Sequence, residues 1–243
     1  MMAEVKKIRV RDRWTIRLHW FNALCWALLV PSGLGIITGD SLRLAPAWWP
    51  QFLQNLFGGN QNLILFHVVV GVAWMVGIGL FMLLRWRSVV LPFLRNVLVL
   101  TPGALWHDLR TMVITMARLF GLMKAAPIPP QGRYNGAQRL LGTMIVFASL
   151  AIAVTGLYLY FGPMVFHFPD NPVYGALFRW ALVIHAAAVF LVLIGLVPHI
   201  YFATVEERES LETMKSGYAE VDFIKHHNPL WYEELKRSGQ LRD

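Results

Sequence analysis

The sequence predicts an all-α integral membrane protein, a bundle of four transmembrane helices with an additional amphipathic helix on the inner membrane surface. Of the 243 residues, 56% are hydrophobic and only 15% are charged, which is more apolar and less charged than a typical soluble domain. Four apolar runs are long enough to cross a bilayer, and the basic residues gather beside them. The net charge of +8 therefore indicates membrane topology rather than binding to nucleic acid.

The four predicted spans each reach the ~20 residues that a helix needs to cross a lipid bilayer. They cover about residues 14–38, 62–86, 136–161 and 175–203. No internal repeat is visible. We expect residues 1–243 to form a single membrane domain in which 204–243 is a cytoplasmic tail.

The distribution of Lys and Arg predicts the orientation. The chain has 22 of them, and only Arg43 and Arg179 lie in or beside the connections 39–61 and 162–175. Because cytoplasmic connections are enriched in basic residues, both termini and the 86–135 connection are expected in the cytoplasm.

The long 86–135 connection contains the amphipathic stretch LWHDLRTMVITMARLFGLM. Arg110 and Arg118 are spaced along it, and Asp108 also interrupts its apolar character. These charges favour a helix lying on the inner membrane face over a fifth span.

The predicted spans contain four histidines. His185 and His199 are fourteen positions apart in one span, which returns them to nearly the same helix face at ~100° per residue. At ~1.5 Å per residue they are about 21 Å apart along the axis, one toward each membrane surface. Topology places His19 at the inner level of His199, and His67 at the outer level of His185.

Two level-matched histidine pairs indicate two b-type haems, each held by two imidazoles. The alternative for any single histidine is a hydrogen-bonded packing role. Two imidazoles without a carboxylate make a poor zinc or di-iron site. The single cysteine, Cys25, excludes a disulfide within the chain, a cysteine-ligated iron–sulfur cluster and covalent CxxCH haem attachment.

Other candidate side chains have more ordinary roles. Methionines within the spans are axial-ligand candidates but are more typical of core packing: Met75, Met82 and Met144. Ser32 and Thr155 are expected to bond to their own backbone. The remaining histidines are expected to have solvated or interface roles in the connections and tail: His107, His167, His226 and His227.

Six sequence motifs, which together cover all four predicted spans in order, resemble those of a known protein family. They are RWTIRLHW around His19, FHVVVG around His67, GRYNGAQR before the third span, LVIHAAA around His185, VPHIYFA around His199, and KHHNPLWYEE in the tail. The chain resembles the cytochrome b membrane (gamma) subunits of respiratory formate dehydrogenases, a di-haem four-helix family related to the cytochromes of hydrogenase and thiosulfate reductase.

The resemblance implies a cofactor assignment and a set of partners. His19 and His199 would hold the inner haem iron, and His67 and His185 the outer one. An iron–sulfur subunit would deliver electrons from a molybdenum or tungsten catalytic subunit, so this chain would not itself oxidise formate. The implied location is the bacterial inner membrane.

The resemblance also implies that a quinone, menaquinone or ubiquinone, is reduced beside the inner haem. Asn135 and the ligand His199 would contact its head group. Gln138 is our addition, because it is three residues from Asn135 and so on a neighbouring position of the first turn of the third span. Asn135 as an N-cap is an alternative that does not exclude a ligand role.

Two other functions stay open from the sequence. The chain would serve a hydrogenase or a thiosulfate or other reductase if a different donor subunit binds it. A haem-free membrane anchor or transporter, with histidines that bind protons or substrate, is the alternative of a different class.

Overall fold

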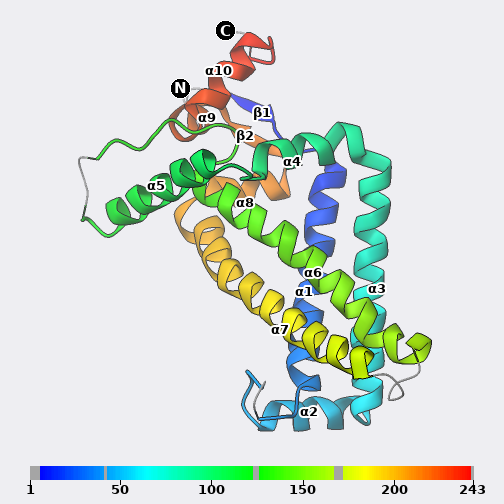
Figure 1. Ribbon diagram of the computed structural model, residues 1–243. Coiled ribbons are helices and arrows are strands. Elements are labelled where there is room, and N and C mark those ends of the chain that lie inside the picture. Colours follow the sequence, from blue (N-terminus) through cyan, green and yellow to red (C-terminus); the bar gives the residue numbers. More distant parts are fainter. Residues whose placement is uncertain (1–5, 41–42, 123–125, 167–171, 242–243) are drawn as a thin grey trace. The chain divides into compact units, whose positions relative to one another are not determined.

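The structure is a computed structural model that describes residues 6–40, 43–122, 126–166 and 172–241, and in these residues it is mainly helical (Figure 1). The longer helices are α1 (Arg13–Ile36), α2 (Trp48–Phe57), α3 (Asn60–Arg85), α5 (Pro102–Leu119), α6 (Gly136–Phe166) and α7 (Pro172–Tyr201). The shorter elements are α4 (Leu91–Val97), α8 (Arg208–Lys215), α9 (Val221–His227), α10 (Pro229–Arg237), the strands β1 (Lys7–Arg9) and β2 (Tyr218–Glu220), and two π-helical turns at Trp86–Val90 and Phe202–Glu206.

Within the described ranges, three helical segments are long and apolar enough to cross a membrane: Asn60–Val97, Gly136–Phe166 and Pro172–Glu206. They contain the second, third and fourth predicted spans. The first predicted span corresponds to α1, which has 24 residues. It is not one of these three segments, because His19 and Asn22 reduce its apolar character. The chain is thus a helical membrane protein, and a fourth span stays a prediction.

The chain divides into two compact units. The first, here called the helical unit, comprises Arg17–Leu84 and the described residues of Ala148–Leu191. The second, the terminal unit, comprises the described residues of Met1–Ile16, Arg85–Phe147 and Val192–Asp243. The amphipathic helix predicted in the 86–135 connection is present in the terminal unit as α5.

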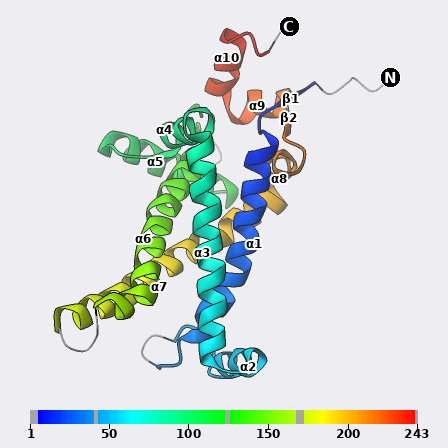
Figure 2. The same ribbon diagram turned by 90° about the vertical axis from the view of Figure 1, so that its right-hand side faces the viewer.

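In the helical unit, α1 and α3 run side by side (Figure 2). The indole Nε1 of Trp74 donates a 2.7 Å hydrogen bond to Oδ1 of Asn22, which satisfies two polar groups on otherwise apolar faces. Gly77 lies against the ring of Phe21, where an added Cβ would come within 2.6 Å of a ring carbon. The small residue therefore allows the two helices to approach closely.

In the terminal unit, the two ends of the chain form a small folded body. Strands β1 and β2 pair antiparallel, with Ile8 opposite Ala219. Ala219 of β2 is buried together with Ile224 of α9 and Leu235 of α10. The described part of the tail forms three helices and the strand β2. A three-residue strand is too short to be recognised from a sequence pattern.

Asp12 caps the N-terminus of α1. Its Oδ1 accepts hydrogen bonds from the backbone amides of Trp14 at 2.8 Å and Thr15 at 2.9 Å, and its Oδ2 lies 3.0 Å from the Arg85 guanidinium. Burial alone would raise the pKa of Asp12, but these hydrogen bonds and the Arg85 charge together lower the pKa below the ordinary value of an aspartate.

We expect Asp12→Ala to lower the stability of the start of α1 by about 1 kcal/mol at neutral pH, the usual cost of losing an N-cap. Because the folded-state pKa is lowered, this stabilisation is complete above the unfolded pKa and is lost as the pH falls through the folded pKa. The unfolding temperatures of the wild type and the alanine variant should therefore differ at pH 7 and converge in strong acid. Asp12→Asn, which keeps a capping oxygen, should stay closer to the wild type at pH 7; a constant wild-type–alanine gap at every pH would contradict this role.

Candidate functional site

His67 lies on α3 in the helical unit and faces α1. Its Nδ1 is 2.9 Å from Oγ of Ser32. The same hydroxyl lies 2.7 Å from the carbonyl oxygen of Leu28, one turn earlier in α1. His67 is therefore tied to a hydroxyl that is itself anchored to its own helix.

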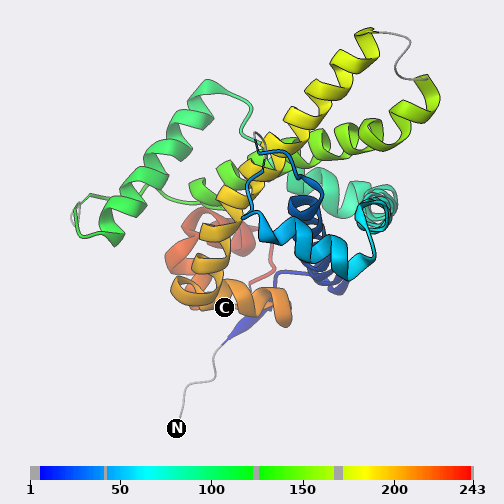
Figure 3. The same ribbon diagram turned by 90° about the horizontal axis from the view of Figure 1, so that it is seen from below.

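His185 lies on α7 and has the same kind of partner. Its Nδ1 is 3.0 Å from Oγ1 of Thr155 on α6, and this hydroxyl is 2.6 Å from the carbonyl oxygen of Ala151. The parts of α6 and α7 in the helical unit run beside each other (Figure 3). The sequence interpretation that Ser32 and Thr155 bond to their own backbone is thus confirmed, but each hydroxyl also contacts a histidine.

These contacts assign the proton of each imidazole. Each hydroxyl oxygen lies only 2.7 or 2.6 Å from a carbonyl oxygen, which can only accept, so this short contact indicates that the hydroxyl gives its single proton to the carbonyl. The hydroxyl oxygen then accepts from the imidazole, which requires the proton on Nδ1 of both His67 and His185. Both rings consequently keep an unprotonated Nε2, the form in which an imidazole binds a metal.

His67 and His185 both belong to the helical unit, as their pairing requires. In the described part of the chain, no three or more His, Cys, Asp or Glu side chains gather as a group that could hold a metal ion. That these two histidines together form a two-imidazole site stays a prediction.

His19 and His199 belong to different units, and each is described by itself. His19 lies on α1 in the helical unit, edge-on to Trp20 with ring centroids 5.6 Å apart. His199 lies near the end of α7 in the terminal unit. Their predicted pairing stays a prediction.

The remaining histidines are placed as the sequence suggested, except that His167 lies outside the described residues. Nδ1 of His107 is 3.1 Å from Oδ1 of Asp108. His226 and His227 are exposed, and each lies near a carbonyl one turn earlier in α9, at 2.7 and 3.1 Å.

Asn135 and Gln138 form a reciprocal capping box at the start of α6. The backbone amide of Gln138 donates to Oδ1 of Asn135 at 2.8 Å, and the amide of Asn135 donates to Oε1 of Gln138 at 3.1 Å. The capping alternative considered for Asn135 is therefore correct, and the helix begins at Gly136 as that alternative requires. The side-chain amide nitrogens of both residues take no part in these capping bonds.

The GRYNGAQR segment that carries Asn135 is held by the C-terminal tail. Nδ2 of Asn228 donates to the carbonyl of Gly132 at 2.7 Å, and the amide of Leu230 donates to the carbonyl of Gln131 at 3.0 Å. The GRYNGAQR and KHHNPLWYEE motifs are therefore joined by hydrogen bonds within the terminal unit.

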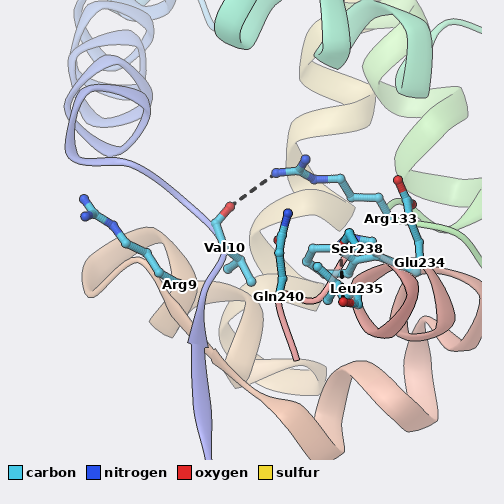
Figure 4. A pocket seen from close by; sticks show the side chains of 8 residues that line it. Arg9, Val10, Arg133, Glu234, Leu235, Ser238 and Gln240 are labelled. Atoms are coloured by element: carbon cyan, nitrogen blue, oxygen red, sulfur yellow. Dashed lines mark hydrogen bonds between the residues drawn. The ribbon is translucent and has the colours of Figure 1, made fainter. Parts of the chain in front are cut away.

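A cavity of about 150 Å³ lies in the same unit between β1 and α10 (Figure 4). Arg133 crosses it and donates to the carbonyl of Val10 at 3.3 Å, while its guanidinium lies 5.4 Å from the ring centroid of Trp231. None of the predicted haem or quinone ligands lines this cavity.

Comparison with known proteins identifies the family. Residues 10–217 match the family described as prokaryotic cytochrome b561. The chain belongs to this family. The cytochrome is similar along nearly its whole length to relatives of known name, so the resemblance inferred from the six motifs is confirmed.

Three of these relatives are formate dehydrogenase subunits. The cytochrome b556(fdo) subunit of Escherichia coli (strain K12) is 23% identical over 232 residues, covering 92% of this chain and 91% of the relative. The nitrate-inducible cytochrome b556(Fdn) subunit of the same strain is 24% identical over 244 residues, covering 98% and 96%. The cytochrome b556 subunit of Haemophilus influenzae is 25% identical over 229 residues, covering 93% and 82%.

Membership of the cytochrome b561 family implies a b-type haem, and the residues of the helical unit fit this group. His67 and His185 supply neutral imidazoles with a free Nε2. Gly33 and Gly156 leave space at the rings, because a Cβ there would lie 3.1 Å from Cε1 of His67 and 3.2 Å from Cε1 of His185. The cytochrome is a membrane electron-transfer protein.

Proposed function

We propose that this cytochrome is the membrane subunit of a quinone-reducing formate dehydrogenase. It would pass electrons from an external iron–sulfur subunit through two bis-histidine b haems to a quinone near the cytoplasmic face. The observation that carries the proposal is the matched pair of imidazoles, both held with Nε2 free, in a chain whose relatives are cytochrome subunits of formate dehydrogenase.

The proposed haem assignments follow the predicted topology. His67 and His185 would hold the haem nearer the outer surface, and His19 with His199 the haem nearer the cytoplasm. In this proposal α1 also crosses the membrane, as the first of four spans, and the chain is one membrane domain in the bacterial inner membrane. Both termini would be cytoplasmic because basic residues flank the spans on that side. Helix α5 would lie on the inner membrane surface.

The protein residues bind and orient, while haem b supplies one-electron redox chemistry when bound. The four histidines would hold the haems through their ring nitrogens, and the helices around them would keep water away. The catalytic molybdenum or tungsten subunit, reached through the iron–sulfur subunit, would oxidise formate.

The direct test is to purify the cytochrome from its native membrane under mild conditions and identify its partners. We expect an iron–sulfur subunit and a formate-oxidising subunit, and formate should reduce the haems of the purified complex. Co-purification with hydrogenase or thiosulfate reductase subunits, and haem reduction only by their substrates, would replace the formate assignment.

The quinone role proposed for Asn135 and Gln138 has a variant that separates it from capping. Asn135→Ser keeps an oxygen that can cap α6 but removes the amide donor. We expect both haems and thermal stability to be retained, while quinone reduction falls about three- to tenfold, as expected for the loss of one hydrogen bond of about 0.5–1.5 kcal/mol. Gln138→Glu makes the corresponding change at the second residue.

Asn96→Ser is the matched control for this experiment. Asn96 lies on α4 in the same unit, and its Nδ2 donates to the carbonyl of Pro92 at 2.7 Å. The Asn96→Ser variant should leave quinone reduction unchanged. Equal activity of Asn135→Ser, Gln138→Glu and the wild type would leave these two residues with capping alone.

A further inference from the structure

Two hydroxyl side chains make matched contacts to the two histidines of the helical unit. Ser32 lies 2.9 Å from Nδ1 of His67, and Thr155 lies 3.0 Å from Nδ1 of His185. We infer that Ser32 and Thr155 are positioning residues that fix the tautomer, and set the electron-donating strength, of the two axial imidazoles of one haem. This inference rests on the proposed haem ligation by His67 and His185.

The hydroxyls fix the tautomer because their own protons are committed. Ser32 donates to the carbonyl of Leu28 at 2.7 Å, and Thr155 donates to that of Ala151 at 2.6 Å. Without such an acceptor, a neutral imidazole among apolar helices has little to keep its proton on Nδ1. A ring protonated on Nε2 instead could not present that nitrogen to iron.

The same contacts affect the iron's redox equilibrium. A ligating histidine that donates Nδ1–H to a neighbouring acceptor is a more basic ligand through its other nitrogen. A more basic ligand stabilises the oxidised iron relative to the reduced iron. Loss of either hydroxyl should therefore favour the reduced haem.

A glycine follows each hydroxyl and completes the positioning. Gly33 and Gly156 leave the ring edges room, since a Cβ at either would approach Cε1 of the facing histidine to 3.1 or 3.2 Å. That distance is tighter than ordinary van der Waals contact and would push the ring away from its hydroxyl. The Ser32-Gly33 and Thr155-Gly156 pairs, on α1 and α6, thus form two equivalent supports for the rings on α3 and α7.

The test is a redox titration of the purified wild-type cytochrome and of two variants, in which the visible spectra report the oxidation state of the haems. The variants are Ser32→Ala and Thr155→Val, and valine keeps the shape of threonine. In each variant we expect one haem, the same one in both, to shift three- to tenfold toward its reduced form at a fixed potential; tenfold corresponds to about 59 mV for a one-electron couple. The electron paramagnetic resonance signal of that oxidised haem should change as well, and the other haem should keep its potential and signal.

Conservative and matched variants separate positioning from packing. Ser32→Thr and Thr155→Ser retain a hydroxyl and should keep wild-type potentials. Thr111→Ala removes a buried hydroxyl that donates only to a carbonyl one turn earlier, that of His107 at 2.9 Å, and should shift neither haem.

Each outcome decides between the inference and its premise. Wild-type protein without haem would overturn the proposed function. Wild-type protein with its haems, but unshifted potentials in both hydroxyl-free variants, would overturn only the positioning role. If the hydroxyl-free variants do not assemble, altered potentials in Ser32→Thr and Thr155→Ser would overturn it, and unaltered potentials with full haem content would support it.

Discussion

Replacing His67 with alanine should reduce the haem content of the purified cytochrome from two haems per chain to one. His67 is held by Ser32 with its Nε2 free, and a bis-histidine haem that loses one of its two axial bonds is held by the other alone. The His185→Ala variant should lose the same haem, because its ring has the equivalent support from Thr155. Haem content is measured by the pyridine haemochrome assay, and the missing haem is identified from the redox titration of the one that stays.

His19→Ala and His199→Ala should each remove the other haem. His226→Ala is the matched control, because this exposed histidine lies near a carbonyl of its own helix α9 and should leave both haems in place. Since His185 and His199 share α7, each variant must elute as a folded, monodisperse protein before its haem is counted. Loss of the same haem in His67→Ala and His19→Ala would show that the proposed pairing is wrong.

Replacing Asp108 with alanine should cause the largest loss of stability among the changes considered. Asp108 is only 1% exposed, and its two carboxylate oxygens lie 3.1 and 3.2 Å from Nη1 of Arg139, joining α5 to the start of α6. Gly136 allows this close approach, because a Cβ there would be 2.9 Å from the Asp108 carbonyl oxygen. Removing one partner of a buried ion pair leaves the other charge uncompensated and costs about 3–5 kcal/mol.

The expected effect is a fall of about 6–20 °C in the unfolding temperature of the detergent-solubilised protein, at about 2–4 °C per kcal/mol for a chain of this size. Asp40→Ala provides the control. Asp40 makes a 2.7 Å ion pair with Arg43, but its side chain is 87% exposed, so its loss should cost less than about 1 kcal/mol. Equal unfolding temperatures for the two variants would refute a structural role for the buried pair.

The sequence was most informative where a long segment has one dominant property. Long apolar runs predicted the helices that became α3, α6 and α7, and the charges on the 86–135 connection separated α5 from the apolar spans. Whether α1 spans the membrane is harder to predict from hydropathy. His19, the predicted ligand, and Asn22, which makes a polar contact with Trp74, are also the residues that make this helix less apolar.

The chemistry of the site was predicted only in part, because hydrogen bonds across helices have no fixed sequence spacing. Ser32 and Thr155 were correctly expected to bond to their own backbone, yet their contacts with His67 and His185 depend on which helices pack together. The shared hydroxyl-glycine order in two spans was a signal that could have revealed them. Local contacts were easier, since the three-residue spacing of Asn135 and Gln138 is the spacing of a capping box.

The central claim is that this chain holds two b haems through four histidines, and the haem stoichiometry of the wild-type protein tests it most directly. The pyridine haemochrome assay, normalised to protein concentration by amino-acid analysis, should give two haem b per 243-residue chain, with a b-type absorption band in the reduced protein. One haem per chain, or no reduced b-type band, would contradict the account.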